Sequence, residues 1–195
     1  MERQGFTAME LSLPQQKELL RLARKTIADS CRQGLPPETP EGNFPPVFYE
    51  HRATFVTLQK QGDLRGCIGS LEVRRPLIED IIYNAFAAAF RDTRFQPVSQ
   101  AELTEIDVEI SILSPLSEMS VSSEDDLLQQ LIPGQDGLVI ENAIYRATFL
   151  PQVWEQLPAA KQFLQHLKQK AGIPLDIWPD DMKCSRYSCL KFKEK

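Results

Sequence analysis

The sequence predicts an α+β fold built on antiparallel sheet. Its expected strands are joined by hairpins or lie around helices, without the regular alternation of strand and helix that a parallel sheet needs. No G-x-G-x-x-G sequence opens a helix after a strand, and no G-x-x-x-x-G-K-S/T sequence occurs, so a nucleotide-binding doubly wound fold has no support. With 195 residues, of which 42% are hydrophobic, the chain can bury a core without disulfides or a metal.

The first expected element is a helix that begins after Ser12, which stands in the N-cap position with a proline close behind it. Apolar residues then recur at helical spacing as far as Cys31, and Gly34 is placed to end the helix. The proline-rich segment 35–48 has little periodicity, which predicts a loop that crosses the surface.

The next expected element is a β-hairpin. Its strands are the segments 53–58 and 64–73, and Gly62 and Asp63 supply the turn between them.

The second strand of this hairpin contains a cysteine between two glycines, in the sequence LRGCIG. Because strand residues alternate between faces, Arg65 and Cys67 are expected to share one face. Gly69 comes next on that face and would leave a gap beside the sulfur, open to a ligand, another backbone or a bulky core residue. Gly66 likewise leaves the opposite face of the strand without a side chain at its position.

A second helix is expected to begin near Pro76, and its broad apolar stripe, which continues to Ala89, should pack across the sheet.

The loop after this helix carries several charges. Arg91 and Arg94 lie near the C-terminus of this helix, where their positive charges would interact favourably with the helix dipole and the unpaired carbonyls. Asp92 and Arg94 form a candidate pair that would fix the loop. Ser99 and Glu102 have the spacing of a capping box, which predicts a short helical turn.

The segment 105–116 is the clearest strand of the sequence. Its isoleucine and valine residues face one side, while acidic and hydroxyl residues, Glu109 among them, face the other. We expect this polar face to border the same cleft as Arg65 and Cys67.

The C-terminal half predicts four more elements. They are a short helix around 123–132, a hairpin over 137–151 that turns at Glu141 and Asn142, a helical region over 152–171 that is bent at Pro158 and closed by Gly172, and a final strand over 182–192. Trp154 and Trp178 are expected to anchor the core or an interface between lobes.

The composition narrows the possible functions. The net charge of −5 and the acidic pI argue against a general nucleic-acid binder. The apolar runs are short, and the N-terminal residues lack the apolar core of a secretion signal, so the sequence predicts no membrane span and a cytoplasmic location.

The four cysteines are predicted to be reduced thiols. No C-x-x-C sequence occurs, and the nearest pair, Cys184 and Cys189, should point to opposite faces of a strand. His51 and His166 are far apart in the sequence, so neither a metal site nor a cofactor is predicted.

Four segments together resemble the AMMECR domain family in its bacterial form, which supplies protein A of the AmmeMemoRadiSam system. They are FVTLQKQGDLRGCIGSLEVRRPLIEDIIYNAFAAAFRDTRFQPVSQAEL, IDVEISILSPL, GQDGLVIENAIYRATFLPQVWEQL and FLQHLKQKAG. The resemblance covers nearly all of the chain beyond its first few residues, and LRGCIG is the family's signature. EHRATFVTL is more polar than the family pattern, so no role is transferred to His51 or Arg52.

The resemblance implies one α+β domain over residues 1–195. It would have two antiparallel sheets covered by helices, in a larger lobe with both termini and a smaller lobe, which share a cleft near 64–71. The resemblance also implies an association, genomic or physical, with a Memo-type protein similar to non-haem dioxygenases and with a radical-SAM protein. It does not imply an established reaction.

Two functional hypotheses follow. In the first, the chain is a non-catalytic module whose cleft binds a partner segment or a metabolite, and the glycines serve shape alone. The candidate ligand contacts are Gly66, Gly69, Arg94, Arg146 and Thr148, of which Arg146 and Thr148 come from the resemblance of RATFLPQVW to the family.

In the second hypothesis, the chain is a thiol-dependent enzyme. Cys67 would act as nucleophile or covalent carrier, Arg65 would hold an anionic ligand or favour the thiolate, and Glu109 would handle a proton. Its weakness is the lack of a base that the sequence can place beside Cys67, and Glu109 would oppose thiolate formation.

Overall fold

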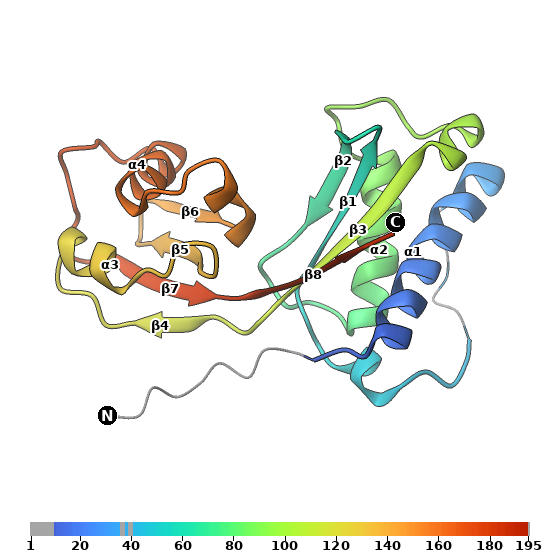
Figure 1. Cartoon of the computed structure of the whole chain (residues 1–195), viewed down its shortest axis with the longest axis horizontal. Coiled ribbons are helices and arrows are strands. Elements are labelled where there is room, and N and C mark those ends of the chain that lie inside the picture. The colour runs from blue at the N-terminus through green and yellow to red at the C-terminus, as the bar shows by residue number, and fades with distance from the viewer. Residues whose placement is uncertain (1–9, 36–37, 39–40, 195) are drawn as a thin grey trace. The chain divides into compact units, whose positions relative to one another are not determined.

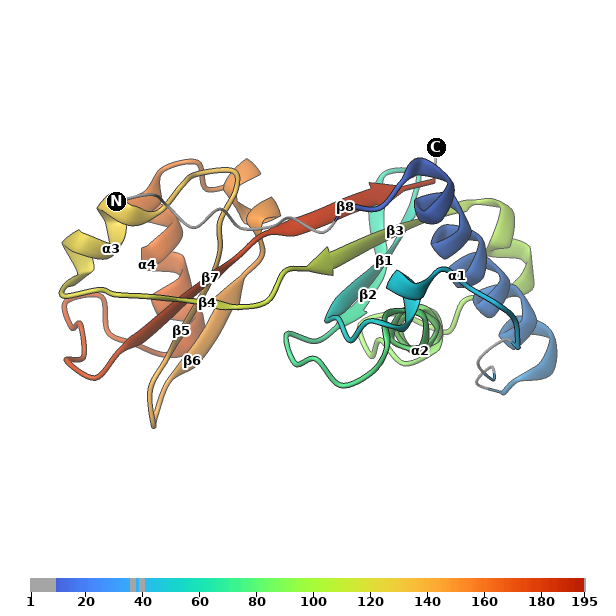
Figure 2. The ribbon, with the colours of Figure 1, turned by 90° about the horizontal axis from the view of Figure 1, so that it is seen from below.

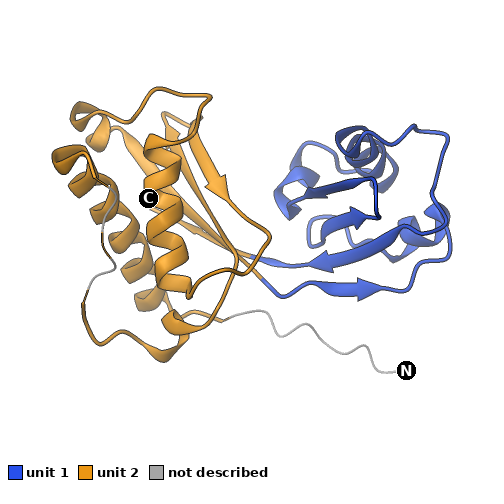
Figure 3. Cartoon of the chain, turned by 180° about the vertical axis from the view of Figure 1, so that it is seen from behind, with its two compact units in different colours: residues 1–8, 114–189 blue, residues 9–113, 190–195 orange. Residues whose placement is uncertain are grey.

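The structure is a computed structural model that describes residues 10–35, 38 and 41–194. These residues form two compact units (Figure 3). The terminal unit holds the described residues up to Leu113 together with those from Leu190 onward, and the inserted unit holds Ser114–Cys189. Each unit contains one four-stranded antiparallel sheet and its own helices, so the predicted α+β fold with two antiparallel sheets is confirmed. A cleft shared near residues 64–71 stays a prediction.

The sheet of the terminal unit has the strand order β2-β1-β3-β8 (Figure 1). The strands are β1 (Thr54–Lys60), β2 (Asp63–Gly69), β3 (Ile106–Leu113) and β8 (Cys189–Lys193). Helices α1 (Leu13–Gln33) and α2 (Leu77–Phe90) pack against one face (Figure 2). Apolar side chains such as Val56, Leu58 and Ile110 complete the core there.

Helix α1 begins and ends as the sequence predicts. Ser12 and Gln15 form a capping box at its start, and Gly34 adopts the left-handed conformation, with φ 69°, at its end. Part of the predicted loop 35–48 lies outside the described residues, as do residues 1–9; its last portion is a 3₁₀ turn, η1 (Pro46–Tyr49), that buries Phe48 in the core.

Two details of the predicted hairpin are wrong. The turn is made by Gln61 and Gly62, both with positive φ, because a two-residue turn of this hand matches the twist of the strands. The second strand ends at Gly69 rather than at 73, since the chain then bends toward α2 and the Ser70 hydroxyl accepts a hydrogen bond from the Glu72 amide.

The sheet of the inserted unit has the strand order β4-β7-β5-β6. Its elements are β4 (Ser117–Met119), α3 (Glu124–Gln130), β5 (Gly137–Glu141), β6 (Arg146–Phe149), the 3₁₀ turn η3 (Pro151–Glu155), α4 (Ala160–Ala171) and β7 (Lys183–Tyr187). Trp154 is a core residue, as expected, and stacks on Phe163 with ring centroids 3.8 Å apart.

The sequence misplaces two features of this C-terminal half. The hairpin turn runs from Asn142 to Tyr145, because the Asn142 side chain accepts hydrogen bonds from two amides that follow it. The single predicted strand over 182–192 is two strands, β7 and β8, which belong to different sheets. Strand β4 was not predicted, since three residues carry too little periodicity.

Across the described part of the chain, none of the helices combines the length and apolar content of a membrane span. All four cysteines are free thiols in the structure, as the spacing predicts, and Cys184 is the buried one.

Candidate functional site

Arg65 lies at a β-bulge, which changes its expected direction. In the pairing of β1 with β2, Gly66 faces Leu58 and Leu64 faces Gln59, so Arg65 is an extra residue that interrupts strict alternation. The inference that Arg65 shares a face with Cys67 therefore does not hold from alternation alone.

The Arg65 guanidinium is bound to Glu102 in the turn η2 (Gln100–Thr104), which the capping box predicted. Its Nε and Nη2 donate to the two carboxylate oxygens of Glu102 at 2.9 and 3.1 Å, and its Cζ lies 5.9 Å from the centre of the Phe95 ring. The hydrogen bonds from Arg65 are the main reason that the pKa of Glu102 is lowered to about 2. The charge of Arg65 is thus balanced by Glu102.

The backbone and the side chain of Cys67 both have polar partners. The Thr57 hydroxyl donates to the Cys67 sulfur at 3.3 Å. The Cys67 N–H donates to Asp92 Oδ2 at 2.9 Å, and the Cys67 carbonyl accepts from Arg94 Nη2 at 3.3 Å. Asp92 and Arg94, which lie 25 and 27 positions further along the chain, are therefore hydrogen-bonded to the backbone of this cysteine.

Asp92 and Arg94 form the loop-fixing pair that the sequence predicts. Arg94 Nε and Nη2 donate to Asp92 Oδ1 and Oδ2 at 2.9 and 2.7 Å, which holds the pKa of Asp92 well below its usual range. The Asp92 side chain is buried, but that of Arg94 is 55% exposed. The side-chain hydrogen bonds of Arg94 to the described residues use Nε and Nη2 and leave Nη1 without one, while the pairing with Asp92 fixes the guanidinium in place.

The two glycines of LRGCIG are explained by close packing. A Cβ atom on Gly66 would lie 2.2 Å from the Ala88 carbonyl oxygen in α2. A Cβ atom on Gly69 would lie 2.3 Å from the Thr54 carbonyl oxygen and 2.4 Å from the Phe55 ring. Of the three occupants predicted for the space at Gly69, the structure therefore shows a backbone and a bulky side chain, since the Thr54 carbonyl and the Phe55 ring lie there.

Glu109 lies in the same row of the sheet as Cys67, but not beside it. Thr57 on β1 faces Cys67 on one side and Glu109 on the other, so one whole strand separates the two residues. Two strand spacings amount to about 9–10 Å. The buried Glu109 carboxylate instead lies 3.1 Å from the Lys191 ammonium.

Arg146 and Thr148 belong to the inserted unit. Arg146 Nε lies 3.2 Å from Glu141 Oε2, and the Thr148 hydroxyl lies 2.9 Å from the Leu138 carbonyl and 2.8 Å from the Tyr187 hydroxyl. Their place in a cleft with Cys67 stays a prediction.

The two histidines take no part in this site. His51 forms an isolated bridge with Pro76, and His166 is exposed, as its position beside the apolar stripe of its helix suggests. The described residues contain no group of three or more histidine, cysteine and acidic side chains that could hold a metal ion.

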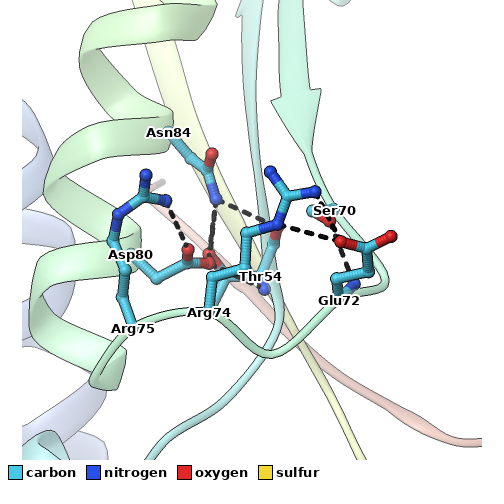
Figure 4. Close-up of polar contacts among 7 residues, drawn as sticks. All are labelled: Thr54, Ser70, Glu72, Arg74, Arg75, Asp80 and Asn84. Carbon is cyan, nitrogen blue, oxygen red and sulfur yellow. Dashed lines mark hydrogen bonds and ion pairs between the residues drawn. The ribbon is translucent and has the colours of Figure 1, made fainter.

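A buried polar network at the Gly69 end of β2 was missed by sequence reasoning (Figure 4). Asp80 Oδ2 accepts hydrogen bonds from the Thr54 amide at 3.1 Å, the Thr54 hydroxyl at 2.7 Å and Asn84 Nδ2 at 3.0 Å. All three residues are buried, and burial is the main cause that raises the pKa of Asp80. Two polar residues four positions apart on an apolar helix are the signal that could have revealed it.

This network is bordered by arginine side chains (Figure 4). Arg75 Nη1 lies 3.5 Å from Asp80 Oδ1, and the Arg75 guanidinium sits 4.0 Å above the Tyr83 ring. Arg74 pairs with Glu72 further out, where both side chains are more than half exposed.

A model of the AMMECR1 family matches residues 20–192 of this chain. The chain belongs to the AMMECR1 family. A protein of Methanothermobacter thermautotrophicus is 38% identical over 190 residues, which cover 94% of this chain and 96% of that protein. A protein of Thermococcus onnurineus is 38% identical over 188 residues, which cover 91% and 89%.

The fold is also similar to a solved AMMECR1 relative. The crystal structure of the uncharacterised protein PH0010 from Pyrococcus horikoshii matches with a TM-score of 0.82 at 34% identity, and the match covers 91% of this chain and 90% of that one. These relatives are archaeal proteins, so the assignment to the bacterial form of the family stays a prediction.

Proposed function

We propose that this AMMECR1 chain is a non-catalytic binding component, and that its ligand or partner segment contacts Cys67 and Arg94. The observation that supports this is the structural role of three other signature residues. Arg65 is paired with Glu102, and both Gly66 and Gly69 pack against backbone atoms. The groups proposed for recognition are the Cys67 sulfur and Nη1 of Arg94, whose side chain is 55% exposed.

The proposed partners are a Memo-type protein and a radical-SAM protein, which would make the chain a component of the AmmeMemoRadiSam system. The resemblance at LRGCIG supports this step, together with the membership of the family. The binding site supports it only in its chemistry, since a fixed arginine with free N–H groups suits a carboxylate or a backbone carbonyl of a partner.

The test uses Cys67 as a reporter of occupancy. The purified chain is mixed with the Memo-type and radical-SAM proteins of the same source, and alkylation of each cysteine by iodoacetamide is followed by mass spectrometry. We expect the partner to slow alkylation of Cys67 while that of Cys31, which lies on α1, is unchanged. Arg94→Gln should weaken this protection and Arg74→Gln should not. Equal alkylation of Cys67 with and without either partner would contradict the proposed partners.

A thiol-dependent enzyme is the second candidate, because a hydroxyl group and a guanidinium group both contact Cys67. The Thr57 hydroxyl donates to the sulfur, and the pKa of Arg94 is raised mainly by its hydrogen bonds to Asp92 and further by its charge interaction with Cys67. The proton-handling role predicted for Glu109 would have to act across the intervening strand.

Alkylation of native Cys67 against pH separates the two candidates. An enzyme thiol should react rapidly in the folded protein, and both Thr57→Val and Arg94→Gln should slow it, whereas Arg65→Gln should have a smaller effect. Protection of Cys67 at every pH at which the fold persists would remove the nucleophile and leave the binding component.

A further inference from the structure

Strand β2 is an outer strand of its sheet, so one of its edges has no neighbouring strand among the residues that the structure describes. Such an edge presents N–H and C=O groups at every second residue, and these are a template for pairing with another chain. The Ser70 amide donates to the Thr54 carbonyl of β1, so the bonds between these strands come from the even-numbered residues of β2 in this stretch. The backbone N–H and C=O of Cys67 therefore point away from β1.

Side chains occupy these outward groups in place of a strand. Asp92 accepts the Cys67 N–H and Arg94 donates to the Cys67 carbonyl, so the pair supplies one acceptor and one donor. A residue of a neighbouring strand would supply the same two groups. The two side chains are fixed to each other by two further hydrogen bonds, which keeps this arrangement in place.

The segment 92–102 is held along the edge at a second point. Glu102 binds Arg65, and Phe95 lies near the guanidinium groups of both Arg65 and Arg94. The bulge at Arg65 further disturbs the edge, and bulges and covering loops are the usual means of protecting outer strands. We call the segment 92–102 the edge cover.

We infer that the outer edge of β2 is a self-pairing surface, and that the edge cover guards it against β2 of a second copy of this chain. The second copy is the matching partner because an antiparallel pair centred on Cys67 is self-complementary. Each Cys67 N–H would meet the Cys67 carbonyl of the other copy, so one residue satisfies both bonds. This inference does not depend on the proposed ligand site, since it concerns the backbone of Cys67.

The pairing predicts a distance between the two Cys67 residues that disulfide cross-linking can test. Residues that exchange both hydrogen bonds in an antiparallel pair have Cα atoms about 5.5 Å apart. Two Cα atoms at roughly 4.4–6.8 Å can be joined by a disulfide. If the edge is uncovered, mild oxidation should therefore link Cys67 of one copy to Cys67 of another.

The test compares Asp92→Ser/Arg94→Ser with Glu72→Ser/Arg74→Ser. Both double variants remove one acid and one base, but the second removes an exposed pair away from the edge. Self-association is measured by sedimentation velocity, and Cys67 cross-links formed with diamide are located by mass spectrometry. We expect the first variant to associate roughly tenfold more tightly than wild type, as the loss of two hydrogen-bonding side chains at the edge suggests, and to give the Cys67 cross-link. The second variant should match wild type.

Two further variants complete the test, and the first of them covers the case in which the double variant does not fold. Arg94→Ser alone leaves Asp92 on the Cys67 N–H and should give a smaller gain in association. Cys67→Pro, added to the uncovered variant, removes the outward N–H while leaving the bonds to β1, and should reverse the association. Association unchanged from wild type in folded Arg94→Ser and in the double variant, or association that survives Cys67→Pro, would overturn the inference.

Discussion

The two ends of strand β2 are held by different electrostatic interactions: a buried, hydrogen-bonded carboxyl group at one end and an ion pair nearer the surface at the other. At the Gly69 end, Asp80 is buried among Thr54 and Asn84, and burial raises its pKa. At the other end, Arg65 binds Glu102 near the surface and lowers the pKa of that carboxyl to about 2. The buried end thus depends on complete hydrogen bonding of a desolvated group, and the outer end depends on opposite charges that water partly screens.

The buried end should be the more sensitive to loss of one partner. Asp80→Ala leaves the Thr54 amide without an acceptor inside the protein, so we expect a loss of about 3 kcal/mol in the free energy of unfolding. Urea denaturation measures it. Asp80→Asn keeps an acceptor oxygen and should lose less, and Glu79→Ala on the same turn should change stability by no more than about 0.5 kcal/mol. An Asp80→Ala loss equal to that of Glu79→Ala would show that the network contributes little.

The glycine between these two ends gives the next largest effect. Gly66→Ala places a Cβ atom 2.2 Å from the Ala88 carbonyl, and a backbone atom within α2 cannot move as a side-chain tip does. We expect a loss of about 2 kcal/mol in the free energy of unfolding. Ser70→Ala, at the half-buried position just after Gly69, is the matched control and should lose much less. A neutral Gly66→Ala would mean that β2 and α2 can separate at no cost.

The elements that sequence alone predicts are those whose signals are local. Helix α1 has Ser12 and Gly34 at its ends and is placed as predicted, and the alternation of β3 places that strand to within three residues. The bulge at Arg65 has no local signal, because it arises from the pairing of β2 with β1. The division of the last strand into β7 and β8 is likewise set by two separate sheets.

In the candidate site too, local contacts could be predicted from the sequence and tertiary contacts could not. Asp92 and Arg94 are two residues apart, so their pairing could be predicted, but their contact with Cys67 depends on how α2 crosses the sheet. The space beside Gly69 could not be judged, because Phe55, which fills it, comes from the neighbouring strand. Local spacing therefore predicts partners on one loop, and it does not predict what tertiary packing brings to the strand.

At the outer end of β2, stability should depend on pH in a defined window. Glu102→Gln removes the charge that binds Arg65, and we expect it to cost about 1 kcal/mol at neutral pH. Because the folded-state pKa of Glu102 is about 2 and the ordinary pKa of a glutamate is 4.5, its stabilisation is fully present above pH 4.5. It is lost as the pH falls from about 4.5 toward 2, so wild type and variant should converge there.

Asp80 should act in the opposite sense over the same acid range. Its folded-state pKa is raised, so the folded protein takes up a proton more readily than the unfolded chain does, and its contribution to stability increases as the pH falls. The difference in the free energy of unfolding between wild type and Glu102→Gln isolates the contribution of Glu102, because Asp80 is present in both proteins. A difference that stays constant from pH 7 to pH 2 would contradict the ion-pair origin of the Glu102 effect.

The smallest effect is expected for Arg74, which lies close to the buried network but on its solvent side (Figure 4). Its side chain is 60% exposed and that of its partner Glu72 is 51% exposed. Water and salt screen such a pair, and holding two long side chains in one geometry costs entropy, so Arg74→Ala should leave the urea midpoint unchanged at low and at high salt. Arg75→Ala is the informative neighbour, because Arg75 reaches Asp80 and stacks on Tyr83, and its loss should lower the midpoint. If Arg74→Ala lowered the urea midpoint as much as Glu102→Gln does, solvent exposure would not explain why one ion pair near this strand stabilises the fold and another does not.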